Sequence, residues 1–173
     1  MRQFYTLFHL NLSYSSIEEE DRPAVIDKCY WPLLRLISKY QWPLAIEASA
    51  FTLLEIEKID SSWNKEFKRL LAQGHCEFVG SGFSQIIGPL VPATINAFNQ
   101  ERGMDLYQEL LGVKPQIALV NEQAYSVGMI EHYKNAGYRA LIMDWCAVAS
   151  GHRDWPSAWR FFPQCTTDDA GNK

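Results

Sequence analysis

Residues 117–126 read Ile-Ala-Leu-Val-Asn-Glu-Gln-Ala-Tyr-Ser. The first four residues form a short apolar run that ends at a turn signal, and this pattern predicts a buried strand. The apolar residues that follow have helical spacing, and Gly137 ends the predicted helix. Glu122 therefore lies where a strand passes into a helix, the place where α/β enzymes position reactive groups. A glutamate there can equally serve as the partner of a helix dipole, so Glu122 is a candidate and both interpretations stay open.

Strand and helix patterns alternate along the chain. We predict strands at residues 4–12, 44–47, 76–79, 117–120 and 140–144. We predict helices from residue 21 (with a kink or split at Pro32) and at residues 50–59, 63–73, 94–111 and 127–136. Residues 145–163 show no clear strand or helix, and residues 164–173 form a polar, frayed tail outside the domain of residues 1–163. The order βαβαβαβαβ predicts an α/β fold with a mainly parallel sheet and right-handed crossovers.

Composition and charge exclude several classes of function. The chain has 173 residues, 47% of them hydrophobic and 21% charged, which is enough for one globular domain with a core. The net charge is −4 without a Lys/Arg cluster, so we expect no nucleic-acid partner and no membrane partner. The four cysteines are scattered, which favours reduced thiols and a cytoplasmic location, and no segment is predicted to be a signal peptide or a membrane span.

Metal and cofactor sites are not predicted. The four histidines lack the H-x-x-x-H and H-E-x-x-H spacings, and the cysteines lack a C-x-x-C pair. The glycines of Gly80-Ser81-Gly82 match neither a P-loop nor a dinucleotide fingerprint, so we interpret them as a tight passage of the backbone beside a ligand or a neighbouring strand. We therefore expect no metal and no cofactor.

Polar side chains end all five predicted strands. They are His9 and Asn11, Glu47, Ser84 and Gln85, Asn121 and Glu122, and Asp144. Because the carboxyl ends of parallel strands lie on one side of a sheet, we predict that these groups share one cleft. Trp145 follows Asp144 directly and is counted with the substrate-contacting candidates.

Five stretches, at residues 8–12, 30–34, 74–92, 117–125 and 136–144, resemble glycoside hydrolase family 57, and the likeness runs from about residue 4 to residue 145. Residues 74–92, Gly-His-Cys-Glu-Phe-Val-Gly-Ser-Gly-Phe-Ser-Gln-Ile-Ile-Gly-Pro-Leu-Val-Pro, resemble its stretch G-x-x-E-φ-φ-x-x-G-φ-x-E-P-φ-φ-P, where φ is apolar. Residues 117–125 are similar to its W-L-x-E nucleophile segment, and residues 8–12 lie where the family has H-x-H-Q-P. The chain departs from these motifs at Asn11, Leu12-Ser13, Gln85 and Leu119, which indicates a divergent subgroup.

The resemblance implies a (β/α)₇-type barrel, of which this chain holds about five βα units. It also implies retaining chemistry on α-linked glucans or related oligo- or polysaccharides, without a metal. Glu122 would be the nucleophile, His9 would face the substrate, and Glu47 and Asp144 would line the site. Asn11, Gln85 and Trp145 join the expected substrate contacts.

The resemblance further implies an incomplete active site. The family's acid/base Asp comes from a segment beyond residue 173, so we expect the chain to be truncated, nearly inert alone and able to self-associate through uncovered strand edges. Two alternatives stay open. One is a non-catalytic carbohydrate-binding or regulatory module, and the other is a metal-dependent polysaccharide deacetylase or α-mannosidase-like hydrolase.

Overall fold

The structure, a computed structural model, describes residues 5–152, 154–168 and 170–171. Three parallel strands, β1 (Leu7–Leu10), β2 (Leu44–Ala48) and β3 (Cys76–Val79), form one sheet in the order β1-β2-β3. Two more, β4 (Ile117–Leu119) and β5 (Ala140–Ile142), pair in parallel beside it. A single parallel bridge between Gly80 and Ala118 joins β3 to β4, so all five strands run the same way. The predicted mainly parallel arrangement is confirmed.

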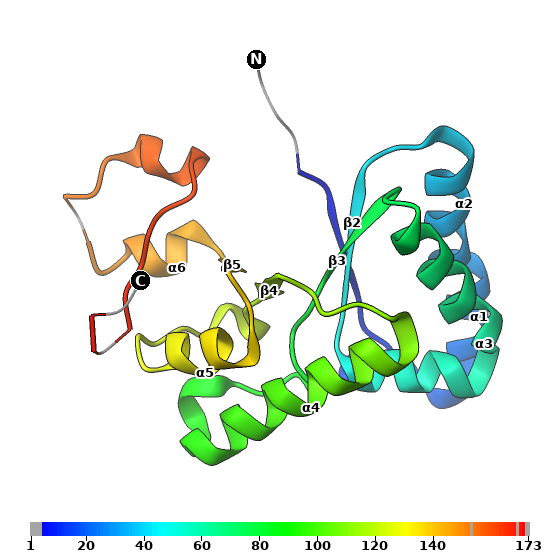
Figure 1. The fold of residues 1–173 in the computed structure, drawn as a ribbon, viewed down its shortest axis with the longest axis horizontal. Helices are drawn as coiled ribbons and strands as arrows, with labels where there is room; N and C mark the ends of the chain where they lie inside the picture. Colours follow the sequence, from blue (N-terminus) through cyan, green and yellow to red (C-terminus); the bar gives the residue numbers. More distant parts are fainter. Residues whose placement is uncertain (1–4, 153, 169, 172–173) are drawn as a thin grey trace.

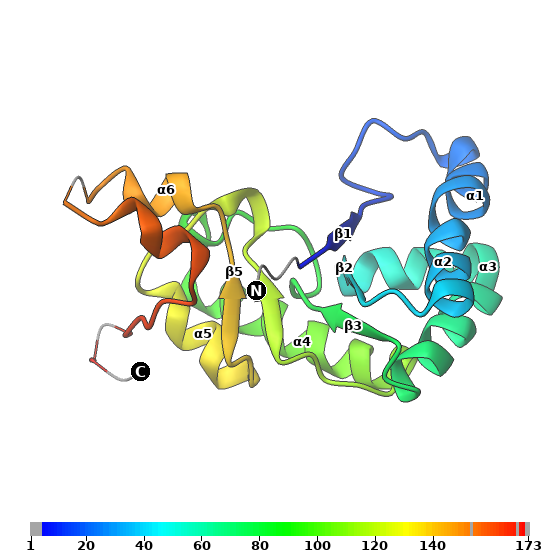
Figure 2. The same ribbon diagram turned by 90° about the horizontal axis from the view of Figure 1, so that it is seen from above.

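The helices follow one another along the strands (Figures 1 and 2). The main ones are α1 (Arg22–Val25), α2 (Trp31–Tyr40), α3 (Ala50–Ala72), α4 (Ala93–Leu111), α5 (Met129–Ala136) and α6 (Trp145–Ala149). Short helical turns lie at Glu19–Asp21 (η1), Ile26–Tyr30 (η2, a π-helix), Gly88–Leu90 (η3), Asn121–Gln123 (η4) and Ser157–Phe161 (η5). Helix α3 packs against α4 and α4 against α5, with α4 passing below the strands in Figure 1. Within the described residues, β1 and β5 are the two outer strands, and Figure 2 shows them well separated.

Most predicted elements occur where the sequence places them, and several are shorter. The first strand spans only residues 7–10 of the predicted 4–12, whose first residue lies outside the described residues. The prediction for residues 145–163 is wrong, because α6 and η5 lie there. The Cys146 N–H donates to Asp144 Oδ1 at 3.2 Å, so an aspartate at the start of α6 satisfies one free helix N–H.

Two irregular helices have local causes. Pro32 lacks an N–H, and the π-helical turn η2 ends two residues before it, so the helix is split there as predicted. Helix α3 contains both predicted helical pieces, separated by a kink at Asp60 with φ −149° and ψ 83°. Asp60 Oδ2 accepts a 2.8 Å hydrogen bond from Trp31 Nε1, which fixes α3 against α2 at the kink.

An aromatic row forms the centre of the core between α3, β3 and α4. Trp63 contacts Phe67 with a ring-centroid distance of 5.1 Å, Phe67 contacts Phe78 at 5.8 Å, and Phe78 contacts Tyr107 at 4.8 Å. Three of these four side chains are completely buried, so much of the aromatic content serves the core. In the described part of the chain, no helix is both long and apolar enough to cross a membrane.

Candidate active site

His9 and Glu47 are direct neighbours at the carboxyl ends of β1 and β2. The strand register pairs these two residues, so their side chains leave the sheet side by side. His9 Nδ1 contacts Glu47 Oε2 in a very short hydrogen bond, while the Glu47 side chain is completely buried and that of His9 is 42% exposed. The hydrogen bond to Glu47 raises the pKa of His9 above its ordinary value, burial lowers it, and the charges of Glu47 and Glu122 raise it further.

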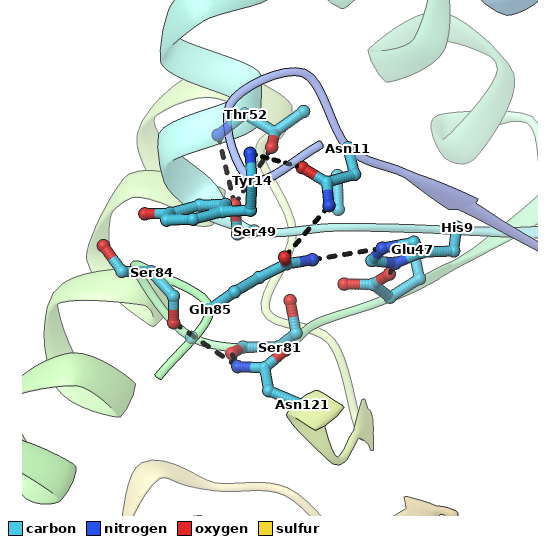
Figure 3. A network of polar contacts seen from close by, with 12 residues as sticks. His9, Asn11, Tyr14, Glu47, Ser49, Thr52, Ser81, Ser84, Gln85 and Asn121 are labelled. Carbon is cyan, nitrogen blue, oxygen red and sulfur yellow. Dashed lines mark hydrogen bonds and ion pairs between the residues drawn. The ribbon is translucent and has the colours of Figure 1, made fainter. Parts of the chain in front are cut away.

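Gln85 connects this pair to Asn11 (Figure 3). Gln85 Nε2 lies 3.1 Å from His9 Nε2, and Gln85 Oε1 accepts a 3.1 Å hydrogen bond from Asn11 Nδ2. The backbone N–H of Tyr14 in turn donates to Asn11 Oδ1 at 2.9 Å. Four of the sequence-predicted site residues, His9, Asn11, Glu47 and Gln85, therefore form one continuous hydrogen-bonded chain.

Glu122 lies in η4, directly after β4, in an unusual backbone conformation. Its φ is 54° and its ψ 15°, and Gln123 follows with φ 53°. Left-handed conformations cost non-glycine residues about 1 kcal/mol or more and occur preferentially at functional sites. The Glu122 residue is exposed, and its carboxylate is near enough to influence the charge of His9. The structure thus brings Glu122 into the neighbourhood of His9 without a direct hydrogen bond between their side chains.

Asp144 and Trp145 lie after β5 and are not part of the hydrogen-bonded chain that contains His9. Asp144 is connected instead to η4, since its backbone N–H donates to Gln123 Oε1 at 2.5 Å. Trp145 contacts Trp155 with a ring-centroid distance of 5.7 Å, and Trp155 stacks on His152 at 4.0 Å. Two surface depressions contain none of the candidates, so the single shared cleft stays a prediction. One is lined by residues of α2 and by Glu66 of α3, and the other by residues between 16 and 29.

Two buried residues of α4, Asn99 and Tyr107, hold the β3–α4 loop and were not predicted as part of the site, whereas the strand-end residue Asn121 was. Asn99 makes two hydrogen bonds to the backbone of Ser84. Its Oδ1 accepts from the Ser84 N–H at 2.8 Å, and its Nδ2 donates to the Ser84 carbonyl at 3.2 Å. Asn121 Nδ2 donates to the Ser81 carbonyl at 2.9 Å and to that of Ser84 at 3.3 Å. Both contacts fix the loop directly before Gln85. A sequence signal did exist for Asn99, because Asn96, Asn99, Gly103 and Tyr107 recur at helical spacing.

Tyr107 and Gly103 of α4 fix the first half of the same loop. The Tyr107 hydroxyl accepts from the Ser81 N–H at 3.1 Å and donates towards the carbonyls of Gly82 (2.8 Å) and Ala48 (3.0 Å). A Cβ at Gly103 would lie 2.6 Å from the backbone carbon of Gly82, so the helix and loop backbones touch. Gly82 itself has φ +87°. The predicted tight backbone passage is confirmed, with strand β4 beside Gly80 and helix α4 beside Gly82.

The side chains of the candidate site offer carboxylates and hydrogen-bonding groups rather than a set of metal ligands. Among the described residues, no group of three or more His, Cys, Asp or Glu side chains is arranged to hold a metal ion. Glu122 is an exposed carboxylate, and Glu47 is buried behind His9.

Comparisons with known proteins find relatives of this chain in sequence and in fold. Alpha-amylase 1 from Dictyoglomus thermophilum is 25% identical over 117 residues, which are 66% of this chain and 17% of the amylase. The crystal structure of 4-alpha-glucanotransferase from Thermococcus litoralis superposes with a TM-score of 0.80 at 17% identity, covering 97% of this chain and 26% of that one. A GH57-type branching enzyme from Pyrococcus horikoshii gives a TM-score of 0.69 at 14% identity, covering 87% and 42%.

These relatives are much longer, so this chain spans between about one sixth and two fifths of their lengths. The solved structures share its fold. The sequence model of the family described as Glycosyl hydrolase family 57 matches residues 3–164, which is nearly the entire chain. By this match the protein belongs to glycosyl hydrolase family 57.

Proposed function

We propose that this protein contributes the nucleophile of a retaining glycoside hydrolase or transglycosidase that acts on α-linked glucans. The observation that carries the proposal is the placement of Glu122, which follows β4 in a left-handed conformation beside the His9 chain. The relatives named as amylase, glucanotransferase and branching enzyme support an α-glucan as substrate. Because this chain covers a small part of each relative, the activity of a complete enzyme is part of the proposal.

The proposed chemistry begins with the Glu122 carboxylate. It attacks the anomeric carbon of the sugar, the glycosidic bond breaks, and a covalent glycosyl-enzyme forms. Water or a second sugar hydroxyl then attacks the same carbon and releases Glu122. Exposure leaves this carboxylate accessible to a substrate, whereas the completely buried Glu47 is not accessible.

Neither Glu47 nor Asp144, the two other carboxyl groups predicted to line the site, suits the role of the second carboxyl group of a retaining mechanism. That group must lie about 5–5.5 Å from the nucleophile and donate a proton to the leaving oxygen. Glu47 is buried and occupied by His9, and Asp144 is engaged at the start of α6. We propose that the acid/base group comes from a segment outside residues 1–173, which would close the barrel between β5 and β1.

A non-catalytic glucan-binding role is the second candidate. It is favoured by the amides Asn11 and Gln85, which stand where the resembled motifs have His and Glu. Under this alternative the chain would bind α-glucans, and replacing Glu122 would leave binding and background hydrolysis unchanged.

Turnover of maltooligosaccharides separates the two candidates. The measurement uses this chain joined to whatever sequence follows it in its gene, and it compares Glu122→Gln with Glu131→Gln, an exposed glutamate of α5. We expect Glu122→Gln to lower turnover by at least about 1,000-fold with glucan binding retained, since only the nucleophile is lost. We expect Glu131→Gln to remain active. Equal turnover in both variants would overturn the assignment of Glu122.

A further inference from the structure

The hydrogen-bonded chain around His9 has a single direction. The Tyr14 N–H is a backbone group and can only donate, so the atom of Asn11 that faces it is the oxygen. The amide nitrogen of Asn11 then points at Gln85 and can only donate, so Gln85 presents its oxygen there. As a result, the NH₂ group of Gln85 is the part that faces His9 Nε2 (Figure 3).

This direction determines which nitrogen of His9 carries the proton. An amide NH₂ can only donate a hydrogen bond, so the Nε2 of His9 that faces it must accept with its lone pair. Nε2 therefore carries no proton. The proton of the neutral ring lies on Nδ1, where it is donated to Glu47 Oε2. Every bond from Tyr14 through Asn11, Gln85 and His9 thus points its hydrogen towards the buried Glu47 carboxylate.

We infer that the Asn11–Gln85 amide pair holds His9 in its neutral, Nδ1-protonated form, so that its Nε2 has no proton to give to a substrate. Asn11 and Gln85 are positioning residues in this arrangement, because they act through His9. They are also two of the departures from the resembled motifs, which have His at position 11 and Glu at position 85. Asn11 and Gln85 are hydrogen-bonded to each other at 3.1 Å. Two neutral amides therefore stand where the resembled motifs have His and Glu, which can carry charge.

Two influences on His9 oppose each other in this site. Glu47 on β2 and Glu122 in η4 are the charged groups that act on the ring, and both favour the imidazolium form. Adding the second proton to Nε2 would set two donors against each other at 3.1 Å. Rotating the Gln85 amide to relieve this conflict would place its NH₂ against the NH₂ of Asn11. Protonation of His9 therefore requires the amide chain to break.

The consequence for the proposed function concerns both proton transfer and substrate class. This part of the inference rests on the proposed function. A neutral His9 cannot protonate a glycosidic oxygen, but its Nε2 lone pair can accept a hydrogen bond from a sugar hydroxyl that displaces Gln85. The charges near His9 are then the two carboxylates Glu47 and Glu122, which favour neutral glucans over phosphorylated or uronic sugars.

Nitrogen-15 NMR of the imidazole rings tests the inference without any activity measurement. The 173-residue protein contains four histidines, and a His9→Gln variant identifies the His9 signals by their loss. In the unaltered protein at neutral pH, we expect His9 to show a protonated Nδ1 and an unprotonated Nε2. A proton on Nε2, in either the neutral or the charged ring, would overturn the inference.

Two variants separate the effect of orientation from that of charge. Asn11→Ala adds no charge but frees Gln85 to turn its oxygen towards Nε2, so His9 should become charged at higher pH than in the unaltered protein. Gln85→Glu supplies an acceptor directly and should move the titration further in the same direction. Gln108→Glu, the same chemical change on an exposed residue of α4, should leave His9 unchanged. If the folded Asn11→Ala protein titrates like the unaltered one, Gln85 does not control His9. A failed proposal for Glu122 would leave these spectra unaffected.

Discussion

Replacing Tyr107 by Phe removes the hydroxyl that joins α4 to the loop before Gln85. The side chain is completely buried, and burial raises the pKa of the phenol well above its ordinary value, so the neutral hydroxyl is the form present. The hydroxyl is the recorded acceptor of the Ser81 N–H, whereas the Gly82 carbonyl also accepts from the Ala50 N–H at 3.0 Å. Phenylalanine keeps the ring packing and leaves the buried Ser81 N–H unpaired.

The expected loss of stability follows from that unpaired group. A buried donor without a partner costs about 1–3 kcal/mol, and the lost hydrogen bond is itself worth about 1 kcal/mol, so the two overlapping costs amount to about 2–3 kcal/mol. Urea unfolding followed by circular dichroism measures the change as a lower midpoint with an unchanged slope. Tyr125→Phe is the matched control, because its hydroxyl makes only an exposed 3.4 Å contact with Thr166, and it should change stability by less than about 0.5 kcal/mol. A Tyr107→Phe protein as stable as this control would refute the role of Tyr107 in holding the loop.

Two further predictions concern packing and thiol reactivity. Gly103→Ala should destabilise the fold by about 1–3 kcal/mol in the same urea assay, because the new Cβ meets the Gly82 backbone. Gly151→Ala should be nearly neutral, since among the described residues its Cβ meets nothing closer than 4.0 Å. Equal midpoints for the two alanine variants would contradict the close backbone contact. Burial raises the pKa of the Cys76 thiol to about 12 from 9.0, so the folded state favours the neutral thiol. The neutral buried thiol therefore stabilises the folded state below pH 9, and this stabilisation is lost as the pH rises from there towards 12. At pH 8 a disulfide reagent should therefore react rapidly with three exposed thiols and with the fourth only after unfolding, and four rapid reactions would contradict this. The three are Cys29, Cys146 and Cys165.

The fold could be predicted from local signals wherever those signals were strong. The strand Cys76–Val79 occurs with its predicted bounds, since turn residues flank a short apolar run. Gly74, Gly112 and Gly137 follow helices with φ of +70°, +73° and +104°, the conformation in which glycine ends a helix. The short helices after residue 144 were missed because one or two turns produce too little periodicity to recognise.

The candidate site was less accessible to sequence reasoning. That His9 and Glu47 meet depends on the register between β1 and β2, which the sequence does not specify. Asn99 has the character of a solvated residue, but it is buried because its amide satisfies both backbone groups of Ser84. The left-handed backbone at Glu122 has no sequence signal, because no glycine lies in Asn-Glu-Gln. These features arise from contacts between distant segments.

If Glu122 is the nucleophile, it forms a covalent bond with a sugar, and that bond can be trapped. A 5-fluoro-α-glucosyl fluoride is suited to this chain, because fluoride leaves without protonation and the reaction does not need the acid/base group. The Glu122 carboxylate would displace fluoride from the anomeric carbon, and the 5-fluoro substituent slows the later hydrolysis. Intact-protein mass spectrometry should show one added glycosyl unit, peptide mapping should place it on Glu122, and Glu122→Gln should remain unlabelled. Labelling of another carboxylate, or equal labelling of Glu122→Gln, would show that Glu122 is not the nucleophile.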